Sequence, residues 1–373
     1  MINHAKSGAS KELANEIEQI GYTQNSKLLN ELIVKTQNEL KTIGESSNSQ
    51  ISDAILLSNN MFINQRLSHI KLAPKLTMQN AFKYALASGE SDAEPSLAKV
   101  MQAIEADRAR NSFWYNVGGG YINENNGGDV KFYGTSLGYD KTYDLSSGSA
   151  IYGVMFGVNK AKYKNKSYED LSKSYSVGIY ADYESVNNHE FQSNLNLAYI
   201  RSDKNFMILN ETQKAKNNGY GVLLSTYYKY RFDLPKNGTY NHSIKPVVLM
   251  EVGHNGVNAF ASKHCKQDRI KNTNIALGLG AEYTIVSDSQ AHTLQAILKK
   301  NVHQTNDSVK VNLSNANSYL EYDIKDKPLS YEVNYIGETR LNDKFVFQYA
   351  VGGTANAKGS YGTKASVKLE YKF

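Results

Sequence analysis

The chain has 373 residues and carries 42 Lys and Arg against 36 Asp and Glu, a formal net charge of +6. This small excess forms no cluster, so no nucleic-acid partner is expected. Mean hydropathy is −0.52 and no apolar run exceeds four residues, whereas a membrane-spanning helix needs ~20, which excludes a helical membrane protein. A transmembrane β-barrel is not excluded, because its strands only alternate in hydropathy and its interior is polar.

Residues 1–110 have a helical pattern. Apolar residues recur at spacings of three and four between Leu28 and Leu40, which predicts an amphipathic helix. After a break at Glu45–Gln50, further helices are expected over Ile51–Ile70, Lys75–Leu86 and Ser96–Arg110. The N-terminus lacks the apolar segment of a signal peptide. We therefore expect a fragment of a longer precursor rather than a protein that is not exported.

From Phe113 onward the hydropathy period is two, which is typical of β-strands with one apolar face. The segments 175–184, 189–199 and 361–373 show it most clearly, and only Tyr180 interrupts a polar row. We count twelve strands, beginning near residues 113, 130, 149, 174, 189, 218, 243, 272, 291, 328, 344 and 360.

The connections between these strands alternate in length. Those after even-numbered strands are short, and the longer ones include Asp203–Asn217, Phe260–Lys271 and Gln304–Lys327. Short turns at one rim and long loops at the other are typical of an outer-membrane barrel. The strands are also long, ~10–14 residues, as tilted membrane strands are. Aromatic residues gather at strand ends, as in an aromatic girdle: Tyr139, Tyr143, Tyr183, Tyr230, Phe232, Tyr283, Phe345 and Tyr371.

These patterns predict an all-β fold, a 12-stranded antiparallel transmembrane β-barrel preceded by helices. A soluble β-sandwich or a secreted β-solenoid stays open as an alternative, since alternation does not reveal which face contacts water. A free-standing porin or adhesin barrel with a periplasmic helical N-terminus is a further alternative.

Several stretches, in their common order, resemble the translocator domain of autotransporters, more narrowly the C-terminal domain of vacuolating-cytotoxin-type autotransporters. They include Ser112–Gly120, Asn126–Gly128, Tyr133–Asp140, His189–Phe191, Lys245–Pro246 and the terminal strand, with Ile63–Ser68 resembling the family's helix that enters the barrel. The resemblance covers roughly residues 60–373. It implies a barrel of the Gram-negative outer membrane that anchors and exports its own upstream passenger segment by type V secretion.

The resemblance also implies a division of the chain and a set of partners. Residues 1–50 would be a helical passenger remnant or stalk at the cell surface, 51–112 a plug helix and linker, and 113–373 the barrel. The expected partners are outer-membrane lipid, the barrel-assembly machinery and the chain's own passenger, with a monomeric barrel and no cofactor. The C-terminal Leu369, Tyr371 and Phe373 would be read as an assembly signal.

The helix Ile51–Ile70 is the predicted plug, with polar residues on one side: Asn59, Asn60, Asn64, Gln65 and Arg66. Because water or a polar helix fills such a lumen, its wall must be polar. The residues expected to line it are Glu184, Glu190, Lys229, Arg231, Glu251 and Glu282. An ordinary soluble helix packed on Leu56 and Leu57 is the alternative.

The sequence has few signals of catalysis. It has no Gly-x-Ser-x-Gly elbow, phosphate-binding loop or His-Glu-x-x-His motif, and its one cysteine, Cys265, is expected in a loop without a metal role. No enzyme activity is therefore expected. One exception is single-turnover self-cleavage at Asn59-Asn60, where an asparagine would attack its own following peptide bond, with Glu190 or Glu251 polarising the amide.

Overall fold

The structure is a computed structural model. It describes residues 14–15, 17–19, 26–46, 50–68, 111–125, 127–145, 147–237, 240–287, 289–305, 308–314, 320–323, 329–342 and 344–373. The helices expected over Lys75–Leu86 and Ser96–Arg110 lie outside these residues. In the described part of the chain, no helix combines the length and the apolar character needed to cross a membrane.

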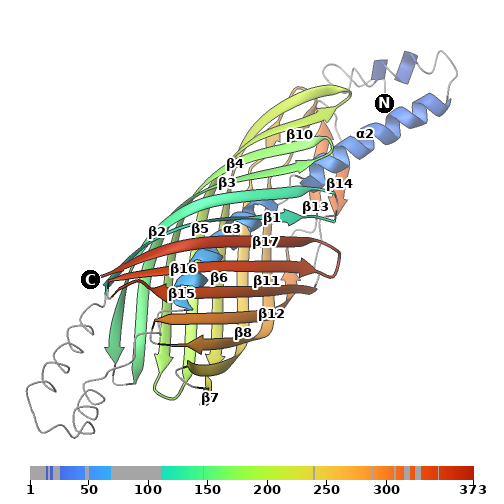
Figure 1. Ribbon diagram of the computed structural model, residues 1–373. Coiled ribbons are helices and arrows are strands. Elements are labelled where there is room, and N and C mark those ends of the chain that lie inside the picture. The colour runs from blue at the N-terminus through green and yellow to red at the C-terminus, as the bar shows by residue number, and fades with distance from the viewer. Residues whose placement is uncertain are drawn as a thin grey trace, which may run out of the picture.

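Twelve antiparallel strands close into a barrel (Figure 1). Each strand pairs with its neighbour along the chain, and β1 pairs with β17 to close the ring. A short strand, β7, continues β6 beyond Arg231 and pairs with β8. The barrel strands are β1 (Asn111–Asn123), β2 (Asp129–Leu145), β3 (Gly148–Asn165), β4 (Tyr168–Ser185), β5 (His189–Ile208), β6 (Glu211–Tyr230) with β7 (Phe232–Asn237), β8 (Tyr240–Val257), β11 (Ile270–Val286), β12 (Gln290–Gln304), β15 (Leu329–Arg340), β16 (Phe345–Asn356) and β17 (Tyr361–Lys372).

The apolar face of the strands points out of the barrel and the polar face points in. On β17, Val367 and Leu369 are 49% and 45% exposed, whereas the intervening Lys368 is 1% exposed. A soluble sandwich would do the opposite, because it buries its apolar faces against each other. The outward apolar surface instead suits a hydrocarbon environment, so the soluble alternative is wrong.

The two rims of the barrel differ. We call the rim where β1 begins and β17 ends the terminal rim, and the opposite one the distal rim. At the distal rim, β5 and β6 form a hairpin whose two strands have 20 residues each. It turns at Leu209 and Asn210, whose φ angles of 51° and 60° suit a two-residue hairpin turn.

The predicted loop Asp203–Asn217 is therefore wrong, since those residues extend β5 and β6. β4 likewise begins at Tyr168 rather than near residue 174. Backbone pairing continues in these extensions after the apolar face stops, which is why hydropathy placed the strand ends too early. Most other predicted strand starts fall within three residues of the observed ones.

The two longest distal connections build a second, four-stranded sheet. It has the order β14 (Leu320–Asp323), β13 (Ser308–Leu313), β10 (Cys265–Gln267) and β9 (Phe260–Ala261). The loops predicted over Phe260–Lys271 and Gln304–Lys327 therefore contain strands. Cys265 lies buried in β10 rather than in a loop, and burial raises the pKa of its thiol to about 12.

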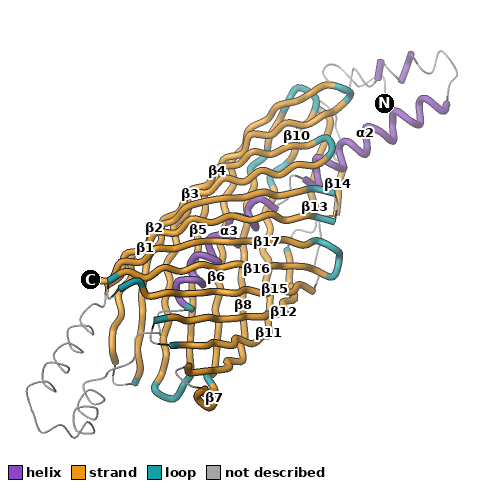
Figure 2. Tube along the Cα trace, in the orientation of Figure 1, coloured by secondary structure: helices purple, strands orange, loops and turns teal. Residues whose placement is uncertain are grey.

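Among the described residues before β1, two long helices are present, besides the short helical stretches 14–15 and 17–19. Helix α2 (Ser26–Ser46) lies at the distal rim, where β10, β13 and β14 also gather (Figure 1). Helix α3 (Gln50–Leu67) runs inside the barrel, behind the front strands in Figure 2. Its 18 residues span about 27 Å, close to the ~30 Å of a bilayer's hydrocarbon core.

Candidate functional site

The site is the lumen of the barrel together with α3, which packs mainly against β1–β6. Three inward-facing glycines make room for the helix. A Cβ added to Gly118 would lie 2.8 Å from Phe62 Cε1, one on Gly178 3.1 Å from Ile63 Cδ1, and one on Gly221 2.9 Å from Leu56 Cδ1. Glycine in a strand interior often marks such a close approach. We call these three residues the glycine groove.

Near the terminal rim, α3 is held by a buried ionic clamp. Arg66 donates from Nε and Nη2 to the two carboxylate oxygens of Asp140, each at 2.7 Å, and from Nη1 to Glu370 Oε2 at 2.6 Å. Tyr180 donates to Asp140 and accepts a hydrogen bond from Trp114 Nε1, at 2.7 and 2.8 Å. A bidentate Arg–carboxylate pair fixes orientation as well as charge, so the clamp sets the register of α3 against β2 and β17. Tyr180, which interrupts the polar row of β4, belongs to this network.

Amide side chains connect the last turns of α3 to several strands. Asn64 donates to Tyr227 OH at 2.8 Å and accepts from Gln192 Nε2 at 2.9 Å. Gln65 Oε1 accepts from Asn116 Nδ2 at 2.9 Å and from Ser366 Oγ at 2.6 Å. Buried polar groups need such partners because water is excluded.

The polar residues of α3 do not share one side, contrary to the sequence-based expectation. Arg66 contacts β2 and β17, whereas Asn60 Nδ2 donates to Glu251 Oε1 on β8 at 3.4 Å. Polar and apolar residues alternate around the helix because the barrel surrounds it, and every side must match a wall.

Five of the predicted lumen residues have buried or largely buried side chains: Glu184, Glu190, Lys229, Glu251 and Glu282. Lys229 and Lys245 bridge Glu190 and Glu282, with N···O distances between 3.0 and 3.6 Å. Arg231 is partly exposed beyond the end of β6 and pairs with Glu184 at 2.5 Å.

A second buried group, near Glu251, was not anticipated. Lys299 contacts Glu251 at 3.4 Å and Glu332 at 3.0 Å, and Lys364 contacts Glu332 at 2.5 Å. Each group pairs two lysines with two glutamates, so the charges cancel, as buried charges require.

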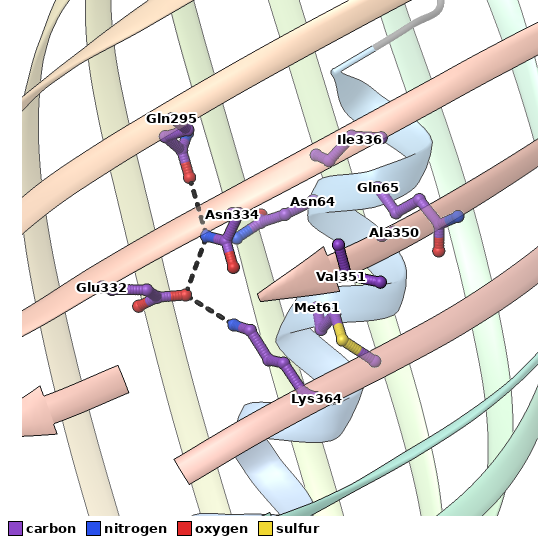
Figure 3. A pocket seen from close by; sticks show the side chains of 10 residues that line it. All are labelled: Met61, Asn64, Gln65, Gln295, Glu332, Asn334, Ile336, Ala350, Val351 and Lys364. Atoms are coloured by element: carbon purple, nitrogen blue, oxygen red, sulfur yellow. Dashed lines mark hydrogen bonds and ion pairs between the residues drawn. The ribbon is translucent and has the colours of Figure 1, made fainter. Parts of the chain in front are cut away.

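A small cavity remains between α3 and the part of the barrel wall formed by β12, β15, β16 and β17, which we call the far wall (Figure 3). Met61, Asn64 and Gln65 line it from the helix. From the wall, Asn334 donates to Gln295 at 3.2 Å and to Glu332 at 3.0 Å. Polar and apolar side chains from both the helix and the wall therefore line this cavity.

The asparagine pair lies in the middle of α3, which is helical throughout. Asn59 Oδ1 accepts from Asn159 Nδ2 at 3.1 Å and from Ser176 Oγ at 3.3 Å. Asn59 Nδ2 is buried without a hydrogen-bond partner among the described residues. Of the two acids expected beside the pair, Glu251 accepts a hydrogen bond from Asn60, and Glu190 pairs with Lys229 and Lys245.

The C-terminal residues lie on the terminal rim. Phe373 exchanges backbone hydrogen bonds with Asn111, at 2.9 and 3.2 Å, and its ring lies near those of Tyr139 and Tyr371, with centroid distances of 6.4 and 5.7 Å. Phe373 and Leu369 point outward and are half exposed. These contacts help to close the seam between β1 and β17.

Sequence reasoning missed the clamp partners Asp140 and Glu370, although both follow the polar row of their strands. Their pairing with Arg66 spans 74 and 304 residues of sequence, and strand periodicity carries no information on contacts across a lumen.

Comparison with known proteins agrees with this architecture. The family described as the C-terminal domain of the vacuolating cytotoxin autotransporter VacA matches residues 57–373. The translocator domain of the autotransporter NalP from Neisseria meningitidis is similar in fold, with a TM-score of 0.56 at 10% identity, over 73% of this chain and 95% of that one. No curated protein sequence matches the chain significantly.

Two further solved structures are similar. The β domain of the Bordetella autotransporter BrkA has a TM-score of 0.53 at 15% identity, over 71% of this chain and 100% of that one. The transport unit of the autotransporter AIDA-I from Escherichia coli has a TM-score of 0.51 at 15% identity, over 70% and 90%. At such identities these likenesses concern the fold.

Proposed function

The chain belongs to the family of vacuolating cytotoxin autotransporter C-terminal domains, and from this premise we propose how its parts serve export. It is an outer-membrane translocator domain of a Gram-negative bacterium, which anchors and exports its own upstream passenger segment. In our proposal residues 1–50 are the passenger remnant or stalk, 51–112 the plug and linker, and 113–373 the barrel.

The course of α3 carries this proposal. Arg66, near the C-terminal end of α3, is clamped near the rim where β1 begins. Asp53, near the start of the helix, accepts a hydrogen bond at 2.6 Å from Asn255, on the distal part of β8. The chain therefore crosses the lumen from the distal to the terminal rim before it enters β1. If the terminal rim faces the periplasm, everything upstream of α3 lies at the cell surface.

We propose two further partners. The outward apolar strand faces suit outer-membrane lipid. The aromatic-ended β17 suits recognition by the barrel-assembly machinery through strand addition before the seam closes. In this view Leu369, Tyr371 and Phe373 form the recognised face.

Protease treatment of intact cells tests the orientation. An epitope placed at Lys11 should be removed while the barrel keeps its heat-modifiable gel mobility. Full protection of the epitope on a folded barrel would instead support a free-standing porin or adhesin with a periplasmic N-terminus.

Self-cleavage is the second candidate, supported by the buried Asn59 amide. Its Oδ1 is held by two donors, while Nδ2 has no hydrogen-bond partner among the described residues. Attack of Nδ2 on the Asn59 carbonyl carbon would form a succinimide, and the proton would pass to the departing Asn60 amine. Because α3 is helical at this position, the reaction requires local opening of the helix.

Mass spectrometry of the purified chain tests this candidate. A fragment beginning at Asn60 should appear in the parent and disappear in Asn59→Ala, while the control Asn64→Ala still yields it. An intact parent chain after prolonged incubation in folded form would rule the reaction out.

A further inference from the structure

The C-terminal half of α2 lies in a cradle formed by the distal connections of the barrel (Figure 1). We use this name for β13, β14 and the distal turn of the β5–β6 hairpin. Leu40 and Ile43 of α2 are 2% and 1% exposed and share an apolar core with Val311 and Phe206. A Cβ on Gly44 would lie 2.9 Å from Tyr322 Cδ2, so the helix backbone sits directly against the small sheet.

Polar contacts lock the same half of α2 in place. Tyr322 OH donates to the Gln37 carbonyl at 3.2 Å. Glu39 Oε2 accepts from the backbone N–H of Leu209 at 2.9 Å, a turn residue that lies outside the β5–β6 ladder, and Lys35 donates to the neighbouring Asn210. Each partner belongs to the barrel domain rather than to α3.

From these contacts we propose that the cradle is a separate, noncovalent anchor for α2, which holds the surface passenger segment on the barrel even when the chain between α2 and α3 is cut. The ligand of this site is the chain's own helix, residues 35–46, and with it any passenger upstream. The inference rests on the proposed function, because it places α2 at the cell surface.

The contrast within α2 supports this assignment. Its N-terminal half exposes Leu28, Ile33 and Val34, whereas apolar residues of the C-terminal half are buried. A helix that only connected a passenger to a plug would not need specific barrel contacts. Here two long connections form a sheet that supplies part of its core, and burial of apolar side chains is the main source of such binding.

A cleavage experiment on intact cells tests the anchor. A recognition site for a specific protease is inserted between Ser46 and Gln50, with an epitope at Lys11, and the cells are washed after cutting. The severed N-terminal fragment should stay with the cells and leave only in denaturant. In Leu40→Asp/Ile43→Asp it should be lost ~100-fold faster, since two charges replace buried apolar contacts.

Matched controls separate the anchor from general effects. Leu28→Asp/Ile33→Asp makes the same kind of change at exposed positions in the N-terminal half of α2, outside residues 35–46, and should leave retention unchanged. Tyr322→Lys removes the cradle side of the contact without altering α2 and should release the fragment. Heat-modifiable mobility shows that each barrel has folded.

The possible outcomes distinguish a failure of the anchor proposal from a failure of the export function. Prompt release of the fragment from the parent would overturn the anchor, and so would retention by the Leu40/Ile43 variant as strong as by the parent. In both cases an accessible epitope leaves the export function intact. An epitope inaccessible before cutting would overturn the export function together with the anchor.

Discussion

Arg66 makes three short contacts to two carboxylates from strands on either side of β1. Its side chain and those of Asp140 and Glu370 are nearly fully buried. Each of the three charged groups is stabilised by the others, because burying an isolated ion costs much free energy. The clamp is therefore a single unit rather than a sum of pairs.

We expect Arg66→Met to lower the free energy of unfolding by about 3–5 kcal/mol, because two buried carboxylates lose their partner. Urea unfolding in detergent measures this. Trp114, the only tryptophan, donates to Tyr180 in the same network and reports on it by fluorescence. The triple variant Arg66→Met/Asp140→Asn/Glu370→Gln should recover most of the loss, since it removes the stranded charges as well. An unchanged single variant would mean that the clamp contributes nothing to stability.

The proposed role of Phe373 is in assembly, before the barrel has folded and closed. We expect Phe373→Ala to refold in detergent nearly as well as the parent, because the side chain is half exposed and the backbone pairing with Asn111 remains. In cells the amount of assembled barrel should fall sharply. Phe345→Ala, which removes another ring at the same rim, serves as control and should assemble normally. Normal cellular assembly of Phe373→Ala would leave this residue a purely structural role.

At the scale of elements, the size of the inward-facing strand residues determines where α3 can pack in the barrel. The glycine groove admits Leu56, Phe62 and Ile63, and the far wall carries long charged side chains instead. Interiors are packed closely enough that a change of a few atoms is felt. The position of α3 within the lumen thus follows from where glycine replaces larger residues.

Gly178→Val should dislodge α3, since even a Cβ at this position comes within 3.1 Å of Ile63 Cδ1 and 2.9 Å of Asn196 Oδ1. The expected result is a larger or noisier single-channel conductance. Ile63→Ala in the same chain should restore the closed state by providing room. Ile179→Val, on the outward face of the same strand, should have no effect. If Gly178→Val conducted like the parent, the groove would not position the helix.

At the scale of the whole molecule, the barrel is self-sufficient in hydrogen bonds. All twelve strands pair on both sides, from the β1–β17 seam to the β8–β11 pair. Closed barrels satisfy their backbone groups without help from other elements. The plug should therefore determine permeability rather than the existence of the fold.

Deletion of residues 1–72 tests this separation. The truncated barrel should still show heat-modifiable mobility, and its conductance in planar bilayers should exceed that of the parent. The physical reason is that removing α3 opens the part of the lumen that the helix fills. Equal conductance of the two chains would mean that α3 does not block the pore.

Much of this architecture could be predicted from residue patterns alone. The period of two beyond Phe113 located the twelve strands, and the helical spacing of apolar residues between Leu28 and Leu40 located α2. These features are local, because side chains alternate along a strand and repeat every 3.6 residues along a helix whatever surrounds them. The resemblance to autotransporters rested on short stretches in a common order, which also follow from the sequence.

Only the tertiary structure showed which strand face points inward and which residues far apart in the sequence contact each other. The direction of the polar face depends on closure of the sheet, so alternation by itself did not show that Lys368 points inward and Leu369 outward. Arg66 meets Glu370 across 304 residues, and two apparent loops pair into a sheet only because the barrel brings them to one rim. Local periodicity is encoded in neighbouring residues, whereas these contacts depend on the register and closure of the whole barrel.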